Sequence, residues 1–285
     1  MKRTWIHHAI IVNEGRRFAG SVVIEGEKIQ EVIEGDGAPA AVCDEQIDAQ
    51  GCFLLPGVID DHVHFRDPGL THKADMATET AAAAAGGVTS FMDMPNCNPQ
   101  TTTLEALENK FKDAATKCIV NYSFYFGATN NNADQLKALD KTHVCGVKLF
   151  MGASTGNMLV DRMEALKKIF SEAGMLIATH CEDQQIIREN TERFKQQYGE
   201  DLDISFHQLI RREEACYHSS ALAVQLAKET GARLHILHIS TARELGLLED
   251  RPLHEKKITA EACVSHLMFC DEDYAQFGAR IKCNP

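Results

Sequence analysis

The sequence lacks the features that define several large classes of protein. No apolar run reaches the ~18 residues of a membrane span, and the N-terminus has no long apolar segment like that of a signal peptide. The ten cysteines include no Cys-x-x-Cys pair, which argues against a disulfide framework and favours reduced thiols in a cytoplasmic protein. Neither a Gly-x-Gly-x-x-Gly nor a Walker A motif is present.

Basic residues are in the minority. Lys and Arg number 29 against 41 Asp and Glu, which gives a formal net charge of −12. An acidic surface argues against nucleic acid as the main partner, although it allows a local cationic pocket for a small anion. We therefore expect a small-molecule substrate and neither a nucleic-acid nor a membrane partner. A homo-oligomer is compatible with the sequence.

Residues 1–53 have the pattern of a small β module. Short strand-like runs cover residues 4–12, 20–25 and 28–33, and Glu25-Gly26-Glu27 has the composition of a hairpin turn. A module of this size buries little core on its own. We expect a β-sandwich that is completed by further strands from elsewhere in the chain.

Residues 54–285 follow a different rhythm, in which apolar runs alternate with helical patterns. The helical patterns cover residues 71–85, 103–117, 161–173 and 206–230, with Asp161 expected as an N-cap. The expected strands are 54–64, 87–95, 119–128, 144–151, 175–181, 233–239 and 256–263. This alternation predicts parallel βαβ units and favours a (β/α)₈ barrel of the TIM type, of which seven units are present. A doubly wound open sheet is the competing architecture.

The first barrel strand ends in residues suited to metal binding. His62 and His64 are two residues apart, so their side chains point to the same face of a strand. Two imidazoles side by side form half of a site for a divalent metal. Arg66 continues this register, and its guanidinium suits a carboxylate.

Other strands carry polar residues at or near the same edge, where active sites of such barrels lie. These residues are Asn96, Lys148, His180, His238 and Glu261. Lys148 is flanked by apolar residues, and two interpretations stay open: a lysine whose head reaches water, or one whose lowered pKa makes it reactive. An offset of three residues places His235 and His238 on opposite faces, so we expect His235 to pack against the helices. The segment 152–157 is glycine-rich, and we interpret it as a strand-to-helix loop and not a phosphate loop.

Together these segments resemble a known family. The sequence Gly57-Val-Ile-Asp-Asp-His-Val-His-Phe-Arg-Asp-Pro-Gly, followed by Asp93-Met-Pro-Asn, Gly146-Val-Lys-Leu-Phe and Ala178-Thr-His-Cys-Glu, is similar to the dihydroorotases of the amidohydrolase superfamily. The resemblance extends over the whole chain.

The resemblance implies a binuclear site, usually of zinc. By motif match, His62 and His64 would hold one ion and His180 and His238 the other. Lys148, carboxylated by CO₂, would bridge the two ions as a carbamate and is the catalytic residue that the match provides. Arg66 and Asn96 would bind the carboxylate of the substrate.

The implied activity is the reversible hydrolysis of dihydroorotate to N-carbamoyl-aspartate in pyrimidine synthesis. Allantoinase and dihydropyrimidinase or hydantoinase are the alternatives, although allantoinases tend to have an apolar residue where Asn96 stands and hydantoinases lack the arginine. A non-catalytic scaffold is the alternative of another class. The family also has an aspartate after an eighth strand, and no residue here matches it. We therefore expect residues 1–285 alone to be inactive.

Overall fold

A computed structural model describes residues 1–152 and 157–285 of the chain. The described residues divide into two compact units, Met1–Val58 and Ile59–Pro285. Residues 153–156, which belong to the expected strand-to-helix loop, lie outside the described residues.

The N-terminal unit is one five-stranded sheet. Its strands are β1 (Arg3–Asn13), β2 (Arg16–Glu25), β3 (Lys28–Glu34), β4 (Glu45–Asp48) and β5 (Phe53–Leu54). The order is β3-β2-β1-β4, with β5 also paired to β1. The first three strands are antiparallel, whereas β4 and β5 run parallel to β1. The expected hairpin turn is confirmed, because Gly26 has a φ of 63° between the paired residues Glu25 and Lys28.

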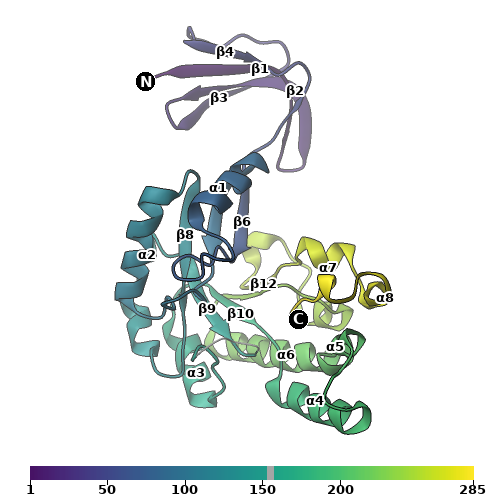
Figure 1. Ribbon diagram of the computed structural model, residues 1–285. Helices are drawn as coiled ribbons and strands as arrows, with labels where there is room; N and C mark the ends of the chain where they lie inside the picture. The colour runs from purple at the N-terminus through teal and green to yellow at the C-terminus, as the bar shows by residue number, and fades with distance from the viewer. Residues whose placement is uncertain (153–156) are drawn as a thin grey trace. The chain divides into compact units, whose positions relative to one another are not determined.

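The second unit is built on a curled sheet of seven parallel strands, which Figure 1 shows with helices packed along its outer side. Strand order follows chain order. The strands are β6 (Val58–Val63), β7 (Val88–Asp93), β8 (Asn121–Gly127), β9 (Gly146–Phe150), β10 (Ile177–His180), β11 (Leu234–Ile236) and β12 (Ile258–Ala260). Each lies inside one of the seven runs expected from the sequence, so the parallel αβ architecture is confirmed.

The helices differ from expectation in several places. They are α1 (Met76–Ala85), α2 (Leu104–Lys117), α3 (Met163–Glu172), α4 (Gln184–Tyr198), α5 (His207–Ile210), α6 (Glu213–Thr230), α7 (Val264–Met268) and α8 (Tyr274–Phe277). Of these, α4, α7 and α8 lie outside the expected helical patterns. The long pattern from Phe206 onward is two helices, α5 and α6. The expected cap at Asp161 is wrong: Arg162 occupies the N-cap of α3, and the Asp161 carboxylate accepts a hydrogen bond from Asn130 instead.

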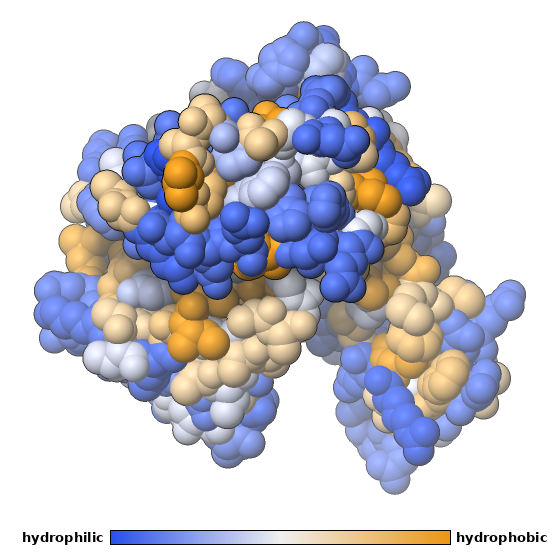
Figure 2. Space-filling view, turned by 90° about the horizontal axis from the view of Figure 1, so that it is seen from above, coloured by the Kyte–Doolittle hydropathy of each residue, from blue (hydrophilic) through white to orange (hydrophobic). Residues whose placement is uncertain are grey.

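The main core lies between the sheet and the helices. It contains Phe124, Val147 and Leu149 from the strands, and Ile169 and Leu226 from the helices. In the space-filling view, hydrophilic residues cover much of the visible surface and hydrophobic residues are interspersed among them (Figure 2). No helix of the described ranges is both long enough and apolar enough to span a membrane.

A buried ion pair connects α2 to the sheet near the strand ends. Lys110 Nζ lies 2.6 Å from an oxygen of Asp93, and both side chains are 1% exposed. Lys110 also donates to the carbonyl oxygen of Met94, and Asp93 accepts from the backbone N–H of Phe65. Burial raises the pKa of Asp93, while the Lys110 ammonium opposes that shift. The pair therefore fixes the segments that follow β6 and β7.

Removing one partner of this pair is expected to destabilise the fold strongly. Lys110→Met should lower the free energy of unfolding by about 3–5 kcal/mol, because Asp93 would stay buried without a counter-charge. Urea unfolding measures the loss. The control is Lys112→Met, which removes the exposed Lys112–Glu108 pair on the same helix and should cost less than about 1 kcal/mol. Equal losses in the two variants would contradict this role for Lys110.

Candidate metal centre at the strand ends

The strand ends bring four histidine rings together. His62 lies on β6 and His64 follows it, while His180 ends β10 and His238 comes two residues after β11. Ring centroids are 5.3 Å apart for His62 and His64, 5.3 Å for His62 and His238, and 4.8 Å for His180 and His238. The structure therefore gathers all four predicted histidine ligands in one row.

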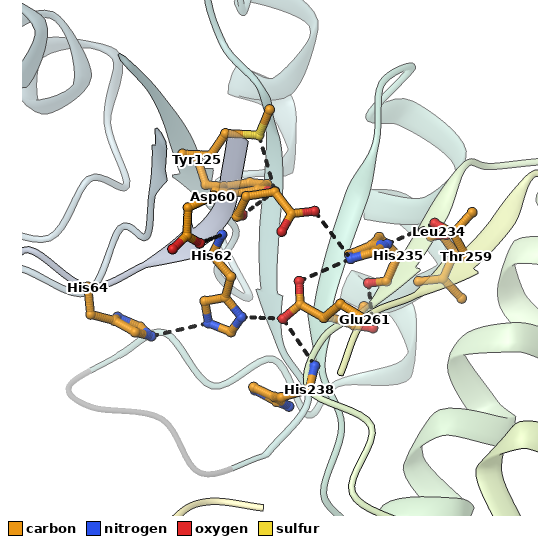
Figure 3. Close-up of polar contacts among 12 residues, drawn as sticks. Asp60, His62, His64, Tyr125, Leu234, His235, His238, Thr259 and Glu261 are labelled. Atoms are coloured by element: carbon orange, nitrogen blue, oxygen red, sulfur yellow. Dashed lines mark hydrogen bonds and ion pairs between the residues drawn. The ribbon is translucent and has the colours of Figure 1, made fainter. Parts of the chain in front are cut away.

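Hydrogen bonds set the tautomers of the first pair. His62 Nδ1 donates to Glu261, and His64 Nδ1 donates to Oδ1 of Asn96 over 2.8 Å. The Nε2 lone pairs of both rings are then free, and the two Nε2 atoms face each other at 3.3 Å (Figure 3). A tetrahedral ion with bonds of about 2.0–2.1 Å holds its ligand atoms about 3.3 Å apart. The pair is thus arranged as two metal ligands.

A hydrogen bond also orients one ring of the second pair, His180 and His238. His180 Nε2 donates to the carboxylate of Glu182 over 2.7 Å, which leaves His180 Nδ1 free to face His238 Nε2 at 3.1 Å. Glu182 is fully buried, and the guanidinium of Arg211 contacts both of its oxygens. Glu182 therefore orients His180 while its own charge is balanced by Arg211.

The electrostatic environment favours the neutral form of His64, His180 and His238. Burial lowers the pKa of His64 and of His238 well below the usual value, and burial also lowers the pKa of His180 against the opposing effect of Glu182. The charge of Lys148 acts in the same direction on all three rings. A neutral imidazole is the form that binds a metal.

Lys148 lies at the centre of β9 and is 1% exposed. Its Nζ lies 4.4 Å from the ring centroid of Phe150 and has no hydrogen-bond partner among residues 1–152 and 157–285. Burial lowers its pKa to about 7. Of the two open interpretations, a lysine whose head reaches water does not fit this burial, and the lowered pKa agrees with the other.

Arg66 and Asn96 lie beside the first histidine pair. The Arg66 charge contributes to the lowered pKa of His64, and within the described ranges its guanidinium makes no ion pair. Arg66 has a φ of 62°, a left-handed conformation that is uncommon outside glycine. Asn96 was predicted to bind the substrate carboxylate, and in the structure its Oδ1 accepts a hydrogen bond from His64 Nδ1. Its Nδ2 remains to donate to another acceptor.

The expectation that His235 packs against the helices is wrong. Its ring contacts the side chains of Glu261 and Thr259, both on or next to β12, as Figure 3 shows. Strand β11 ends at Ile236, and His238 has a left-handed φ of 40°. The strict alternation of side chains therefore stops before His238, and an offset of three no longer separates the two rings.

Two carboxylates contact the predicted histidines, although neither was predicted as a ligand or a substrate-binding residue. Glu261 accepts from His62 Nδ1, contacts His235 Nε2 at 3.2 Å and accepts from the backbone N–H of His238 at 3.1 Å. Glu182 holds His180. The spacing of Glu182, two residues after His180, was the available signal. The position of Glu261 at a strand end indicates that it lies near the site, but it does not indicate which histidines Glu261 contacts.

Loss of the Glu261 charge is expected to weaken metal binding. Glu261→Gln should reduce the affinity for Zn²⁺ by about 10–100-fold, because an outer carboxylate fixes the tautomer and raises the basicity of a histidine ligand. Competition with a chromophoric chelator measures the affinity. Glu244→Gln is the matched control, because Glu244 is also buried but is bound by the hydroxyls of Ser220 and Thr241. Unchanged affinity in Glu261→Gln would contradict the role of Glu261.

The residues present fit two divalent metal ions. Two pairs of ring nitrogens converge, three of the four rings have their other nitrogen held by a polar partner, and a buried lysine lies among them. Such an N-rich donor set suits Zn²⁺ and related ions.

Comparison with known proteins identifies the family. Residues 51–244 match the family described as dihydro-orotase-like. The chain is 32% identical to an allantoinase of Deinococcus radiodurans over 97% of its own length, and 33% identical to a dihydroorotase of Methanosarcina mazei over 93%. It spans 61% and 58% of those two proteins.

A solved structure agrees with this assignment. The L-hydantoinase (dihydropyrimidinase) of Arthrobacter aurescens superposes with a TM-score of 0.92 at 25% identity, covering 100% of this chain and 63% of that one. Allantoinases, dihydroorotases and hydantoinases are thus all similar to this chain. The chain belongs to the dihydroorotase-like family of the amidohydrolase superfamily.

Proposed function

We propose that this chain forms the metal-binding part of a cyclic amidohydrolase, and that its substrate is dihydroorotate. The single observation that carries the proposal is the convergence of His62 with His64 and of His180 with His238 around the buried Lys148. The reaction adds water across the ring C–N amide bond and gives N-carbamoyl-aspartate; ring closure is the reverse.

His62 and His64 would hold one divalent ion, and His180 and His238 the other, with zinc as our preferred metal. When bound, such ions polarise an amide carbonyl and lower the pKa of water from 15.7 to about 7. Glu261, Asn96 and Glu182 support this by keeping the ligand nitrogens unprotonated and correctly oriented.

Lys148 would supply the bridge between the two ions. With a pKa of about 7, a large fraction of its amine is neutral at neutral pH. The lone pair of Nζ would attack the carbon of CO₂, so that an N–C bond forms, one C=O π pair moves to oxygen and one N–H proton leaves to solvent. The product is a carbamate anion, whose burial the bound cations compensate.

The substrate carboxylate would be bound by Arg66 and by Nδ2 of Asn96. Arg66 is half-buried and has no ion pair within the described ranges, so its fork is available to an anion. Dihydroorotate carries a carboxylate on its ring, whereas allantoin, dihydrouracil and hydantoin do not. These two residues are the reason for placing dihydroorotate first.

Allantoinase is the second candidate, because five relatives of this chain at 31–33% identity carry that name. A non-catalytic scaffold is less favoured, since neutral, oriented imidazoles around a buried lysine are costly features for a barrel without chemistry.

A substrate panel tests the proposal. The longest natural form of the chain is loaded with Zn²⁺ and bicarbonate, and turnover of dihydroorotate, allantoin, dihydrouracil and hydantoin is compared. Dihydroorotate should give the highest kcat/KM. Preference for allantoin would replace dihydroorotate with the second candidate, and a metal-loaded protein that turns over none of the four would favour the scaffold.

A further inference from the structure

A second cluster of metal-ligating side chains lies in the N-terminal unit. His7 and His8 on β1 approach Asp48 at the end of β4. The Nδ1 atoms of the two histidines are 3.1 Å apart, and His8 Nδ1 lies 3.0 Å from an oxygen of Asp48. All three ligand atoms lie within 4.8 Å of one another.

Adjacent residues of a regular strand point to opposite faces, so two neighbouring histidines do not normally meet. Here a bulge interrupts the pairing of β1 with β2 between Ile6 and Ala9, and His8 takes a left-handed φ of 52°. This conformation turns the His8 ring to the side of His7. Left-handed non-glycine residues are a recognised pointer to function.

Backbone hydrogen bonds connect the bulge to the segment that follows β4. The N–H of Ala49 donates to the carbonyl of His7, and the N–H of Gly51 donates to the carbonyl of His8. The Asp48 carboxylate accepts from the N–H of Gln50, a bond that lowers the pKa of Asp48 together with its contact to His8. The backbone of His7 and His8 is therefore connected directly to the segment that carries Asp48.

With neutral rings, the single proton available at His8 Nδ1 or His7 Nδ1 cannot form a linear hydrogen bond in both contacts. If His8 Nδ1 carries the proton and donates to Asp48, that proton is not available to His7. If His7 donates to His8, then two lone pairs of His8 and Asp48 face each other at 3.0 Å. A cation among the three atoms satisfies all of them at once.

We propose that His7, His8 and Asp48 form a binding site for a divalent transition-metal ion, such as Zn²⁺ or Cu²⁺, with two nitrogens and one oxygen as ligands. The side chains of His8 and Asp48 are 66% and 47% exposed, and both rings border a hollow of about 330 Å³, so an ion can enter and keep water ligands. Residues 1–53 contain nine acidic and five basic residues, which favours a cation.

The fluorescence of a tryptophan beside this site can report metal binding. Trp5 is the only tryptophan of the chain, and its ring centroid lies 4.4 Å from that of His7. We expect Cu²⁺, added to the chelator-treated full chain, to quench Trp5 fluorescence in a saturable way. A bound ion would connect β1 to β4, because His7 and His8 lie on β1 and Asp48 lies on β4.

His8→Asn is the main variant, because asparagine also tolerates the left-handed conformation and preserves the bulge. His8→Asn and Asp48→Asn should each raise the Cu²⁺ concentration needed for half-maximal quenching at least tenfold. The control is His143→Asn, since His143 is exposed and bound to Asp140 but has no second histidine beside it in the described ranges. Quenching that is the same in His8→Asn, Asp48→Asn and the wild type would overturn the proposal. Because all of these variants keep the barrel histidines, the result is independent of the proposed catalytic site.

Discussion

Replacing Lys148 with methionine is expected to abolish the binuclear centre. Methionine fills a similar volume in the core but cannot react with CO₂, so the proposed carbamate could not form. We expect kcat/KM of the full enzyme to fall by about 10³-fold or more, since bound metal contributes several kcal/mol to the transition state. Metal content should fall at the same time.

Controls separate this effect from general damage to the fold. Lys117→Met removes a partly exposed lysine that pairs with Asp67 and should keep its metal. Lys148→Ala leaves space for a small acid, so added propionate should restore part of the bound metal if the missing group is a carboxylate. Full metal content in Lys148→Met, or no effect of propionate under any condition tested, would contradict the carbamate.

Replacing Arg66 with glutamine is expected to change the substrate preference. The variant should lose about 10²–10³-fold in kcat/KM for dihydroorotate, because truncating one partner of a desolvated charge pair costs about 2–5 kcal/mol. Turnover of dihydrouracil, which has no carboxylate, should change far less. Arg66→Lys should be intermediate, since lysine keeps the charge but loses the two-pronged geometry. Parallel losses on both substrates would show that Arg66 supports the fold or the metal and not the carboxylate.

The barrel strands were predictable because their apolar runs are long and end in turn residues. Buried parallel strands read as continuous hydrophobic segments, and all seven expected runs contain a strand. Helix α4 was not expected, since most of its side chains are charged or carry amides and only Ile187 and Asn190 are buried. The capping of α3 was wrong because Asp161 found a tertiary partner in Asn130.

The structure brings the predicted histidines together, but their hydrogen-bond partners could not be predicted from the sequence. The two-residue spacing of His62 and His64 survives in the fold, because both lie at the end of one strand. The environment of His238 could not be read from spacing, since a left-handed residue after β11 changes the direction of the chain. Glu261 meets His62 across a separation of 199 residues, a contact that local sequence cannot indicate. The His7–His8 cluster likewise depends on a bulge.

The most direct test of the proposed binuclear centre is the metal content of the chain after incubation with Zn²⁺ and bicarbonate, measured by mass spectrometry. The measurement uses the His8→Asn variant, so that zinc bound by the N-terminal cluster is not counted. The barrel site predicts about two bound ions per chain, and fewer in His62→Ala and Lys148→Met. A chain that retains no zinc under these conditions, or that retains the same amount after both substitutions, would contradict it.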